Sequence, residues 1–308
     1  MPDLLALSPN FTVDVTLTVP EITAGNVMRA TAVSRQAAGR SANVARIMRQ
    51  LGRDAEIGGF LGGSNGEFVQ RQYESEGLRG HYVWCDGETQ ERVVLSEQDG
   101  RTTTINEQGI TVSSEHIAQL AAHIKRISDQ YNWVSFSGDI PSDSYTTIFD
   151  AARPAKLAVD CGGDGSVVLA RHNIDLLCIT GREAGSLLGW SIESIDDAFR
   201  ACKELHSWGN ALAIISLDEL GAIGYDGQNG CHAVVPDVTV ERTADAGDGI
   251  LAGVLDALMA AQPLDEVMRR GVAVGAACCT AKAAGFLPMD TYHALLSQVT
   301  LKKSRSAL

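Results

Sequence analysis

A stretch in the last third of the chain, residues 242–253 (RTADAGDGILAG), places small residues and two carboxylates at the predicted start of a buried helix. Backbone N–H groups at such a start bind phosphate, helped by the helix dipole, and the small Ala246 and Gly247 leave room for a ligand. Asp248 is placed to take the proton of an attacking hydroxyl, as a general base does in phosphoryl transfer. The competing interpretation is a capped helix, with Asp245 as N-cap and a capping box between Asp245 and Asp248. The motif alone leaves the two interpretations evenly balanced.

A second candidate motif is residues 38–45 (AGRSANVA). Its small residues, Gly39 among them, let the backbone approach a ligand, and Ser41 is the expected N-cap of the following helix. Asn43 could hydrogen-bond sugar hydroxyls, and Arg40 could bind an anion. Short motifs of small residues are common by chance, so this segment by itself favours a capped loop that enters a helix.

Two further turns follow predicted strands, at residues 137–141 (SGDIP) and 217–221 (LDELG). Ligands of open α/β sheets bind beyond the carboxyl ends of the strands, where both turns are expected to lie. Each turn is also what any strand-to-helix connection needs, so neither is specific alone.

Short apolar runs alternate with helical patterns along most of the chain. This alternation predicts an α/β fold, with a mostly parallel sheet covered by helices on both faces. The expected strands are residues 4–7, 55–61, 133–137, 157–159, 174–179 and 212–217. The expected helices are residues 41–51, 66–76, 114–127, 142–152, 183–188, 195–206, 246–261, 264–284 and 290–299.

Three segments alternate apolar and polar residues instead, at residues 11–19, 27–37 and 91–105. That period indicates a sheet with one wet face, which we expect to project as a lid and to offer an edge for a homodimer. The predicted division is therefore a main domain of residues 1–10, 38–90 and 106–300, a β lid of residues 11–37 and 91–105, and a tail of residues 301–308.

The composition excludes several classes of function. The 308-residue chain carries a net charge of −13, which disfavours binding to nucleic acid or to an anionic membrane surface. Seven cysteines without a CxxC pair indicate buried thiols in a reducing cytoplasm. The first ten residues lack a basic region and a long apolar run, so we expect no signal peptide, and a cytoplasmic location follows.

Taken together, the order and spacing of these segments resemble the phosphofructokinase-B (ribokinase-like) carbohydrate kinase family, and within it the branch of 1-phosphofructokinase and tagatose-6-phosphate kinase. The resemblance runs from Leu5 to about Gly285. Residues 38–45 stand at the family's Gly-Gly-Lys-Gly-x-Asn-Val-Ala, and residues 245–248 stand at its Gly-Ala-Gly-Asp. Four other segments are similar to the branch: residues 10–14 (NFTVD), 25–30 (GNVMRA), 60–68 (FLGGSNGEF) and 104–109 (TINEQG).

The resemblance implies transfer of the γ-phosphoryl group of ATP, with Mg²⁺, to a hydroxyl of a sugar or sugar phosphate. Asp248 would be the base, and the backbone of Asp245, Ala246 and Gly247 would form an anion hole. The implied substrate-binding residues are Asp14, Gly39, Arg40, Asn43, Arg92 and Asp139. The implied nucleotide-binding residues are Thr180, Glu183, Ser216, Asp218 and Gly221, with Glu183 also serving the metal.

The chain departs from the family pattern around this expected site. Asp245 and Asp218 stand where the family has Gly, and Asp139 stands where it has Ser. Arg40 and Ser41 replace Lys and Gly, Thr180 replaces the Asn of Asn-x-x-Glu, and Gln90 replaces a phosphate-binding Arg, with Arg92 two residues further on. The three added carboxylates matter most, because two charges about 4 Å apart repel by about 4 kcal/mol at a partly solvated site.

Three hypotheses follow for the activity. The chain is a kinase for an unphosphorylated sugar, a kinase for a sugar phosphate that uses Arg40, Arg92 or Arg101, or a weakened or inactive relative that binds a sugar or nucleotide as a sensor or structural partner. Asp248 and Glu183 favour an enzyme, so a kinase is the preferred prediction. A dinucleotide-dependent oxidoreductase is disfavoured, because no GxGxxG follows the first strand.

Overall fold

The computed structural model describes residues 2–138, 140, 144–160, 172–243 and 245–303. Its main sheet has ten strands in the described part of the chain, in the order β14-β13-β12-β11-β10-β9-β8-β1-β4-β5. The parallel strands are β1 (Leu4–Ser8), β4 (Ala55–Leu61), β5 (Gly80–Trp84), β8 (Trp133–Ser137), β9 (Lys156–Asp160), β10 (Leu176–Thr180) and β11 (Leu212–Ser216). An antiparallel edge follows, made of β12 (Ala222–Tyr225), β13 (Gly230–Val234) and β14 (Thr300–Lys303).

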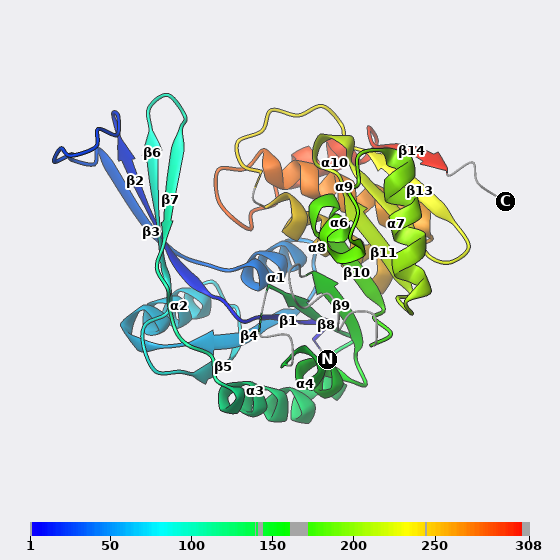
Figure 1. The fold of residues 1–308 in the computed structure, drawn as a ribbon, viewed down its shortest axis with the longest axis horizontal. Coiled ribbons are helices and arrows are strands. Elements are labelled where there is room, and N and C mark those ends of the chain that lie inside the picture. Colours follow the sequence, from blue (N-terminus) through cyan, green and yellow to red (C-terminus); the bar gives the residue numbers. More distant parts are fainter. Residues whose placement is uncertain (1, 139, 141–143, 161–171, 244, 304–308) are drawn as a thin grey trace.

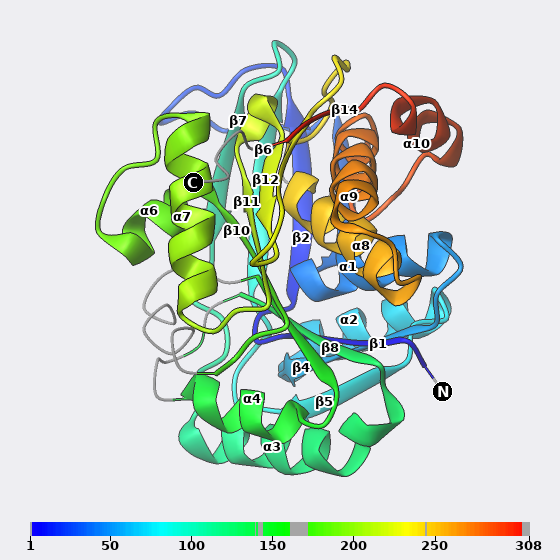
Figure 2. The same cartoon turned by 90° about the vertical axis from the view of Figure 1, so that its right-hand side faces the viewer.

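Helices cover both faces of this sheet, and each layer closes its own apolar core (Figure 2). One layer contains α1 (Arg40–Gln50), α2 (Gly63–Ser75), α8 (Ala246–Met259), α9 (Leu264–Cys279) and α10 (Met289–Leu296). The other layer contains α3 (Ser114–Ile127), α4 (Tyr145–Ala152), α6 (Gly181–Leu188) and α7 (Ile195–Ser207). The central strands are buried on both faces, which explains their unbroken apolar sequence. The predicted α/β fold class is confirmed.

Glycines set the close packing of α8 against α9. A Cβ atom added at Gly249 would lie 2.9 Å from Cα of Gly275, and one added at Gly253 would lie 3.0 Å from Cα of Gly271. The two backbones therefore meet without intervening side chains, and this contact fixes the N-terminal turn of α8 against the core. The sequence places Asp248 in that turn.

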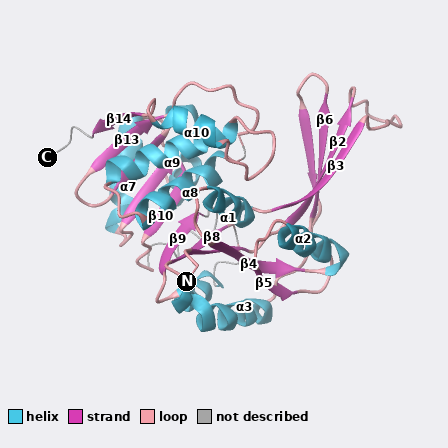
Figure 3. Ribbon diagram, turned by 180° about the vertical axis from the view of Figure 1, so that it is seen from behind, coloured by secondary structure: helices cyan, strands magenta, loops and turns pink. Residues whose placement is uncertain are grey.

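A second, four-stranded sheet projects from the main body (Figures 1 and 3). Its strands are β2 (Thr12–Val19), β3 (Ala32–Ala38), β6 (Glu91–Glu97) and β7 (Thr102–Asn106), in the order β3-β2-β6-β7. The central pair, β2 and β6, is parallel, and each outer strand is antiparallel to its neighbour. We call this sheet the lid. All five residues of β7 and the first four of β3 are exposed, so both edges of the lid face solvent.

Several boundaries differ from the sequence-based expectation. Residues 27–31 are not in a strand, and β3 begins at Ala32. Residues 301–303, expected as the start of a tail, lie in β14 and pair with β13. The short strands β5, β12 and β13 were not expected, since β5 is only half-buried and the other two form a hairpin too short to show a clear period. The division into a main domain and a lid remains a prediction.

Candidate functional site

Asp248 lies in the first turn of α8, with its side chain only 3% exposed. Its Oδ2 accepts a hydrogen bond of 3.0 Å from Nδ2 of Asn43, and its Oδ1 accepts one of 3.3 Å from Nε of Arg40. Burial raises the pKa of Asp248 to about 7, while Arg40 and Asn43 oppose that rise. A carboxylate with such a pKa is half-ionised near neutrality and can accept a proton there.

Arg40 and Asn43 both come from the N-terminal turn of α1, which brings two segments over 200 residues apart in sequence into one site. The side chain of Ser41 is buried within α1, and Gly39 occupies the N-cap position, so the expected N-cap role of Ser41 is wrong. Gly39 also lies against Phe11, since an added Cβ would be 2.8 Å from Cδ1 of that ring. Only a residue without a side chain fits between the ring and α1.

Asp160, at the carboxyl end of β9, is a member of this cluster that the sequence analysis missed. Its Oδ2 accepts a hydrogen bond from Nη2 of Arg40, so the guanidinium bridges Asp160 and Asp248. The attraction of Asp160, opposed by burial, raises the pKa of Arg40. An Asp directly after an unbroken apolar strand was the signal, because ligand sites of open sheets lie at such strand ends.

The side chain of Asp245 does not cap α8. Asp245 occupies the N-cap position, but its Oδ2 accepts the backbone N–H of Gly285 at 3.1 Å and its Oδ1 lies 3.4 Å from Nη2 of Arg242. The capping box expected between Asp245 and Asp248 is therefore wrong. The backbone N–H of Ala246 donates to the carbonyl of Thr243 at 3.2 Å. Among the described side chains, none caps this first helical turn, an arrangement that suits a helix start at which an anion binds.

Asp14 and Arg92 face each other across the parallel pair β2 and β6 of the lid. Nε of Arg92 donates to Oδ1 of Asp14 at 3.0 Å, Nη2 of Arg92 donates to Oδ2 of Asp14, and Thr12 donates to the same carboxylate at 2.9 Å. Asp14 is buried, whereas the side chain of Arg92 is 37% exposed. Arg101 lies instead at the β6–β7 turn, where it pairs with Glu97 and Asp99.

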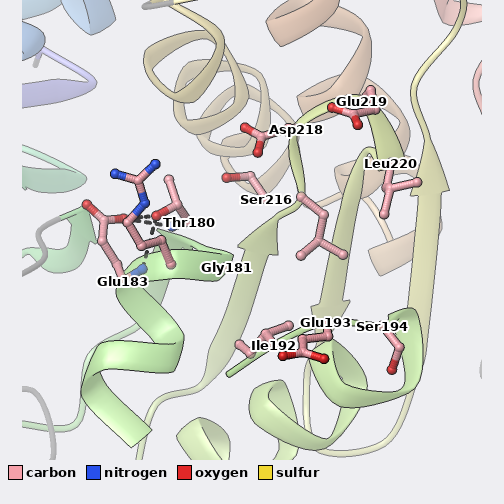
Figure 4. Close-up of a pocket in the computed structure, with 12 residues that line it drawn as sticks. Thr180, Gly181, Glu183, Ile192, Glu193, Ser194, Ser216, Asp218, Glu219 and Leu220 are labelled. Atoms are coloured by element: carbon pink, nitrogen blue, oxygen red, sulfur yellow. Dashed lines mark hydrogen bonds between the residues drawn. The ribbon is translucent and has the colours of Figure 1, made fainter. Parts of the chain in front are cut away.

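A cavity of about 520 Å³ opens between α6 and the end of β11 (Figure 4). The predicted nucleotide residues Thr180, Glu183, Ser216 and Asp218 line it. Thr180 and Glu183 form a capping box at the start of α6, in which Oε2 of Glu183 accepts from both N and Oγ1 of Thr180 at 2.7 and 2.8 Å. Asp218 adopts a left-handed conformation, with φ of 47°.

A second cavity of about 450 Å³ adjoins the first and shares Asp218 and Glu219 with it. Gly221 belongs to this second cavity, together with apolar side chains from the segment after β13 and from α8 and α9. The shared turn of residues 218–221 thus lies between a cavity of mixed polar and apolar lining and a mainly apolar one, a combination that suits a ligand with a polar end and an apolar end. The sequence pointed to Gly221 but to none of the individual apolar side chains of this cavity, because its walls come from four separate segments.

The structure thus joins some predicted residues and leaves others apart. Hydrogen bonds link Arg40, Asn43 and Asp248, and a separate set links Asp14 and Arg92. Among residues with described positions, no group of three His, Cys, Asp or Glu side chains forms a ready-made metal site. Asp139 lies outside the described residues. The described helices include none long and apolar enough to cross a membrane.

The model of the pfkB family of carbohydrate kinases matches residues 9–291. The chain belongs to this family. Membership confirms the predicted resemblance, and the mostly parallel sheet with its small second sheet matches the ribokinase-like structures of the family.

Curated and solved relatives agree with this assignment. The chain is 27% identical to a 1-phosphofructokinase of Escherichia coli K12, with 92% of this chain and 93% of the relative covered. It is also 27% identical to a 1-phosphofructokinase of Bacillus subtilis, with 90% and 92% covered. A structure of a phosphofructokinase from Staphylococcus aureus, described as putative, matches with a TM-score of 0.84 at 25% identity, over 98% of this chain and 99% of that one. Phosphofructokinase-2 from Escherichia coli in complex with potassium matches with a TM-score of 0.90 at 23% identity, over 97% and 99%, and shows the shared fold.

Proposed function

We propose that this pfkB-family protein transfers the γ-phosphoryl group of ATP to a hydroxyl of a sugar phosphate, with Asp248 as the general base. The observation that carries the proposal is the buried Asp248 carboxylate at the start of α8, held by Arg40 and Asn43 with a pKa near 7. In this role Asp248 takes the proton of the acceptor hydroxyl as that oxygen attacks phosphorus. The backbone from Asp245 to Gly247 stabilises the charge on the transferring group.

The cavity beside α6 supports binding of ATP with Mg²⁺. When bound, the metal–nucleotide complex supplies the phosphoryl group and offsets its charge. Glu183 is the candidate metal-binding residue, since only its Oε2 is engaged by Thr180 in the capping box, and Mg²⁺ prefers oxygen ligands. Ser216, Asp218 and Gly221 would line the bound nucleotide, whose base fits the adjoining apolar cavity.

The acceptor is proposed to be a sugar phosphate because curated relatives of this chain are 1-phosphofructokinases. Asp14 and Asn43 offer hydrogen-bonding groups to sugar hydroxyls. Arg92, exposed on the lid beside Asp14, is the proposed partner of the substrate phosphate. Asp139 remains a predicted substrate residue.

We further propose a cytoplasmic homodimer that pairs through the lid, without a nucleic-acid or membrane partner. Both lid edges face solvent and carry exposed apolar side chains, with Val33 65% and Ile105 55% exposed. Buried free thiols at every described cysteine suit a reducing compartment.

The orientation of Asp245 supports an active enzyme over an inactive relative. A carboxylate aimed at the γ-phosphate would oppose ATP binding, but that of Asp245 is engaged by Gly285 and Arg242. The carboxylate expected from the sequence to repel phosphate is therefore engaged by a cation and a backbone N–H of neighbouring segments.

The test is ADP release with Mg²⁺ and ATP across fructose 1-phosphate, fructose 6-phosphate, tagatose 6-phosphate and the free sugars. We expect turnover with a sugar phosphate, and loss of that turnover in Asp248→Asn with folding intact by circular dichroism. Equal rates in the variant and the parent would refute the role of Asp248 as base. Binding of nucleotide or sugar with no turnover anywhere in the panel would support the inactive alternative.

A further inference from the structure

A chain of hydrogen bonds runs from the end of α2, through α1, to the general base. Both carboxylate oxygens of Glu76 accept hydrogen bonds from Arg46: Oε2 accepts from Nε at 2.7 Å, and Oε1 accepts from Nη2 at 2.8 Å. Nη1 of Arg46 then donates to Oδ1 of Asn43 at 3.3 Å, and Nδ2 of Asn43 donates to Oδ2 of Asp248 at 3.0 Å. Arg46 is therefore linked to Asp248 through Asn43, and not by a hydrogen bond of its own in this series.

The guanidinium of Arg46 is held in place on several sides. Besides the two bonds to Glu76, its Nη2 donates to the carbonyl of Ala37 at 3.3 Å, and its Cζ lies 5.2 Å from the centre of the Tyr73 ring. The backbone at Gly285 closes the remaining side, since a Cβ added there would lie 2.9 Å from Cδ of Arg46. Only 15% of the Arg46 side chain is exposed, so this cation is a fixed part of the structure.

The direction of hydrogen bonding in this chain follows from the chemistry of its members. A guanidinium can only donate, so the end of the Asn43 amide that faces Arg46 must be the carbonyl oxygen. The amide NH₂ is thereby turned towards Asp248, where the hydrogen bond that it donates favours the ionised carboxylate over the protonated acid. If the amide were reversed, its carbonyl would face Asp248 and would stabilise the protonated acid instead.

From these contacts we infer that Arg46 is a positioning residue for the general base, which acts by fixing the orientation of the Asn43 amide. The inference deepens the proposed kinase function and rests on it. Burial favours protonated Asp248, and a protonated acid cannot take a proton from the acceptor hydroxyl. Arg46 opposes that tendency from outside the site, through one intervening side chain.

Other charged and titratable groups act on Asp248 as well. Arg40 from α1 stabilises its ionised form, whereas Asp160 from β9 and Asp245 from α8 favour its protonated form. Among the described residues, the thiol of Cys278 on α9 also interacts with Asp248. A variant at position 46 leaves these four groups in the protein, but it also removes a cation that interacts with Asp245. An Asn43→Ala background therefore serves to separate the Arg46–Asn43 contact from that charge effect.

The first experiment is the pH dependence of kcat/KM for Arg46→Met, which removes the donor but keeps an unbranched side chain against Tyr73. We expect the midpoint of the acid limb to move up by about 1 pH unit, which gives about an eightfold loss at pH 6.5 and little loss at pH 9. Arg49→Met is the matched control, because Arg49 lies on the same helix and its side-chain hydrogen bonds within the described residues go to the carbonyls of Glu76 and Gly77 rather than to Asn43. An unmoved midpoint in Arg46→Met, or the same shift in Arg49→Met, overturns the inference.

Two further variants separate positioning from general structural damage. If Arg46 acts through Asn43, then Arg46→Met produces no additional midpoint shift in an Asn43→Ala background, and an undiminished shift there contradicts the inference. If Arg46→Met does not fold, Glu76→Gln is the alternative variant, because it weakens the two hydrogen bonds from Arg46 to residue 76 while leaving Arg46 in place. We expect Glu76→Gln to shift the midpoint upward by a smaller amount, and no shift would count against the inference.

A second readout needs no enzyme activity. The folded-state pKa of Asp248, about 7, lies above its unfolded value of about 4, so Asp248 releases its proton at lower pH in the unfolded chain. The free energy of unfolding of the parent, relative to Asp248→Asn, must therefore fall as the pH rises from about 4 to about 7 and then level off. In Arg46→Met this fall should continue about 1 pH unit higher, and an unchanged curve overturns the inference. If the parent phosphorylates no sugar, the proposed function fails, but this stability readout still decides the role of Arg46.

Discussion

The carboxylate of Asp245 accepts the backbone N–H of Gly285 at 3.1 Å and thereby ties the start of α8 to the loop after α9. The sequence suggested that this carboxylate, beside the expected anion hole, would repel phosphate, but the contact gives it a structural role. The Asp245 carboxylate links the two segments by this hydrogen bond, and its Oδ1 also lies 3.4 Å from Nη2 of Arg242. We therefore expect Asp245 to stabilise the fold more than it inhibits phosphate binding.

The first prediction concerns Asp245 itself. Asp245→Gly removes both the bond to Gly285 and the ion pair with Arg242, and we expect it to lower the free energy of unfolding by about 2 kcal/mol. Asp245→Asn keeps an acceptor for Gly285 and should cost less. Chemical denaturation of each variant and of the parent measures these changes in the free energy of unfolding. A rise in ATP affinity or turnover in Asp245→Gly would show that the carboxylate inhibits the site after all.

The second prediction is a pH dependence. Because Asp248 must be ionised to act as a base and its pKa is about 7, kcat/KM should fall about tenfold per pH unit below that value and level off above it. Initial rates between about pH 5.5 and pH 9 test this expectation. A profile that is flat across that range is incompatible with Asp248 as the base.

The third prediction concerns the left-handed Asp218. Asp218→Asn keeps a residue that tolerates this conformation but removes a negative charge from the cavity beside α6, so we expect a lower KM for ATP. Asp218→Gly should lower that KM similarly and relieve the backbone as well. Glu219→Gln removes a second charge from the same cavity and shows whether the effect depends on which carboxylate is lost. If all three variants bind ATP as the parent does, the charge of Asp218 does not oppose the nucleotide.

The fourth prediction tests the phosphate of the acceptor. Arg92→Met should raise the KM for the sugar phosphate about tenfold or more, because an Arg–phosphate contact is a charge-assisted hydrogen bond. Arg101→Met serves as control, since Arg101 belongs to the same strand pair but is held at the β6–β7 turn by Glu97 and Asp99. Equal KM values in the two variants would place the substrate phosphate elsewhere.

The sequence predicted an element correctly where the pattern within that one segment was sufficient to identify it. The apolar strand at residues 55–61 and the capped helix at residues 114–127 were predicted with the bounds that the structure has. The link between Arg40 and Asp160 could not be predicted, because it joins residues 120 positions apart through the packing of α1 over the sheet. The direction in which the Asp245 side chain points likewise depends on the Gly285 backbone, which no local pattern reveals.

Part of the proposed acceptor site resides in the lid, and this has a mechanical consequence. The parallel pairing of β2 with β6 fuses two hairpins, and the Asp14–Arg92 pair bridges that seam. The chain enters the lid twice, before β2 and before β6, and leaves it twice, after β3 and after β7. All four connections lie at one end of the lid, so we expect the lid to tilt as one rigid unit. Asp14 and Arg92 would then move together. Whatever acceptor they bind would meet a carboxylate and a guanidinium at a fixed spacing, however far the lid tilts.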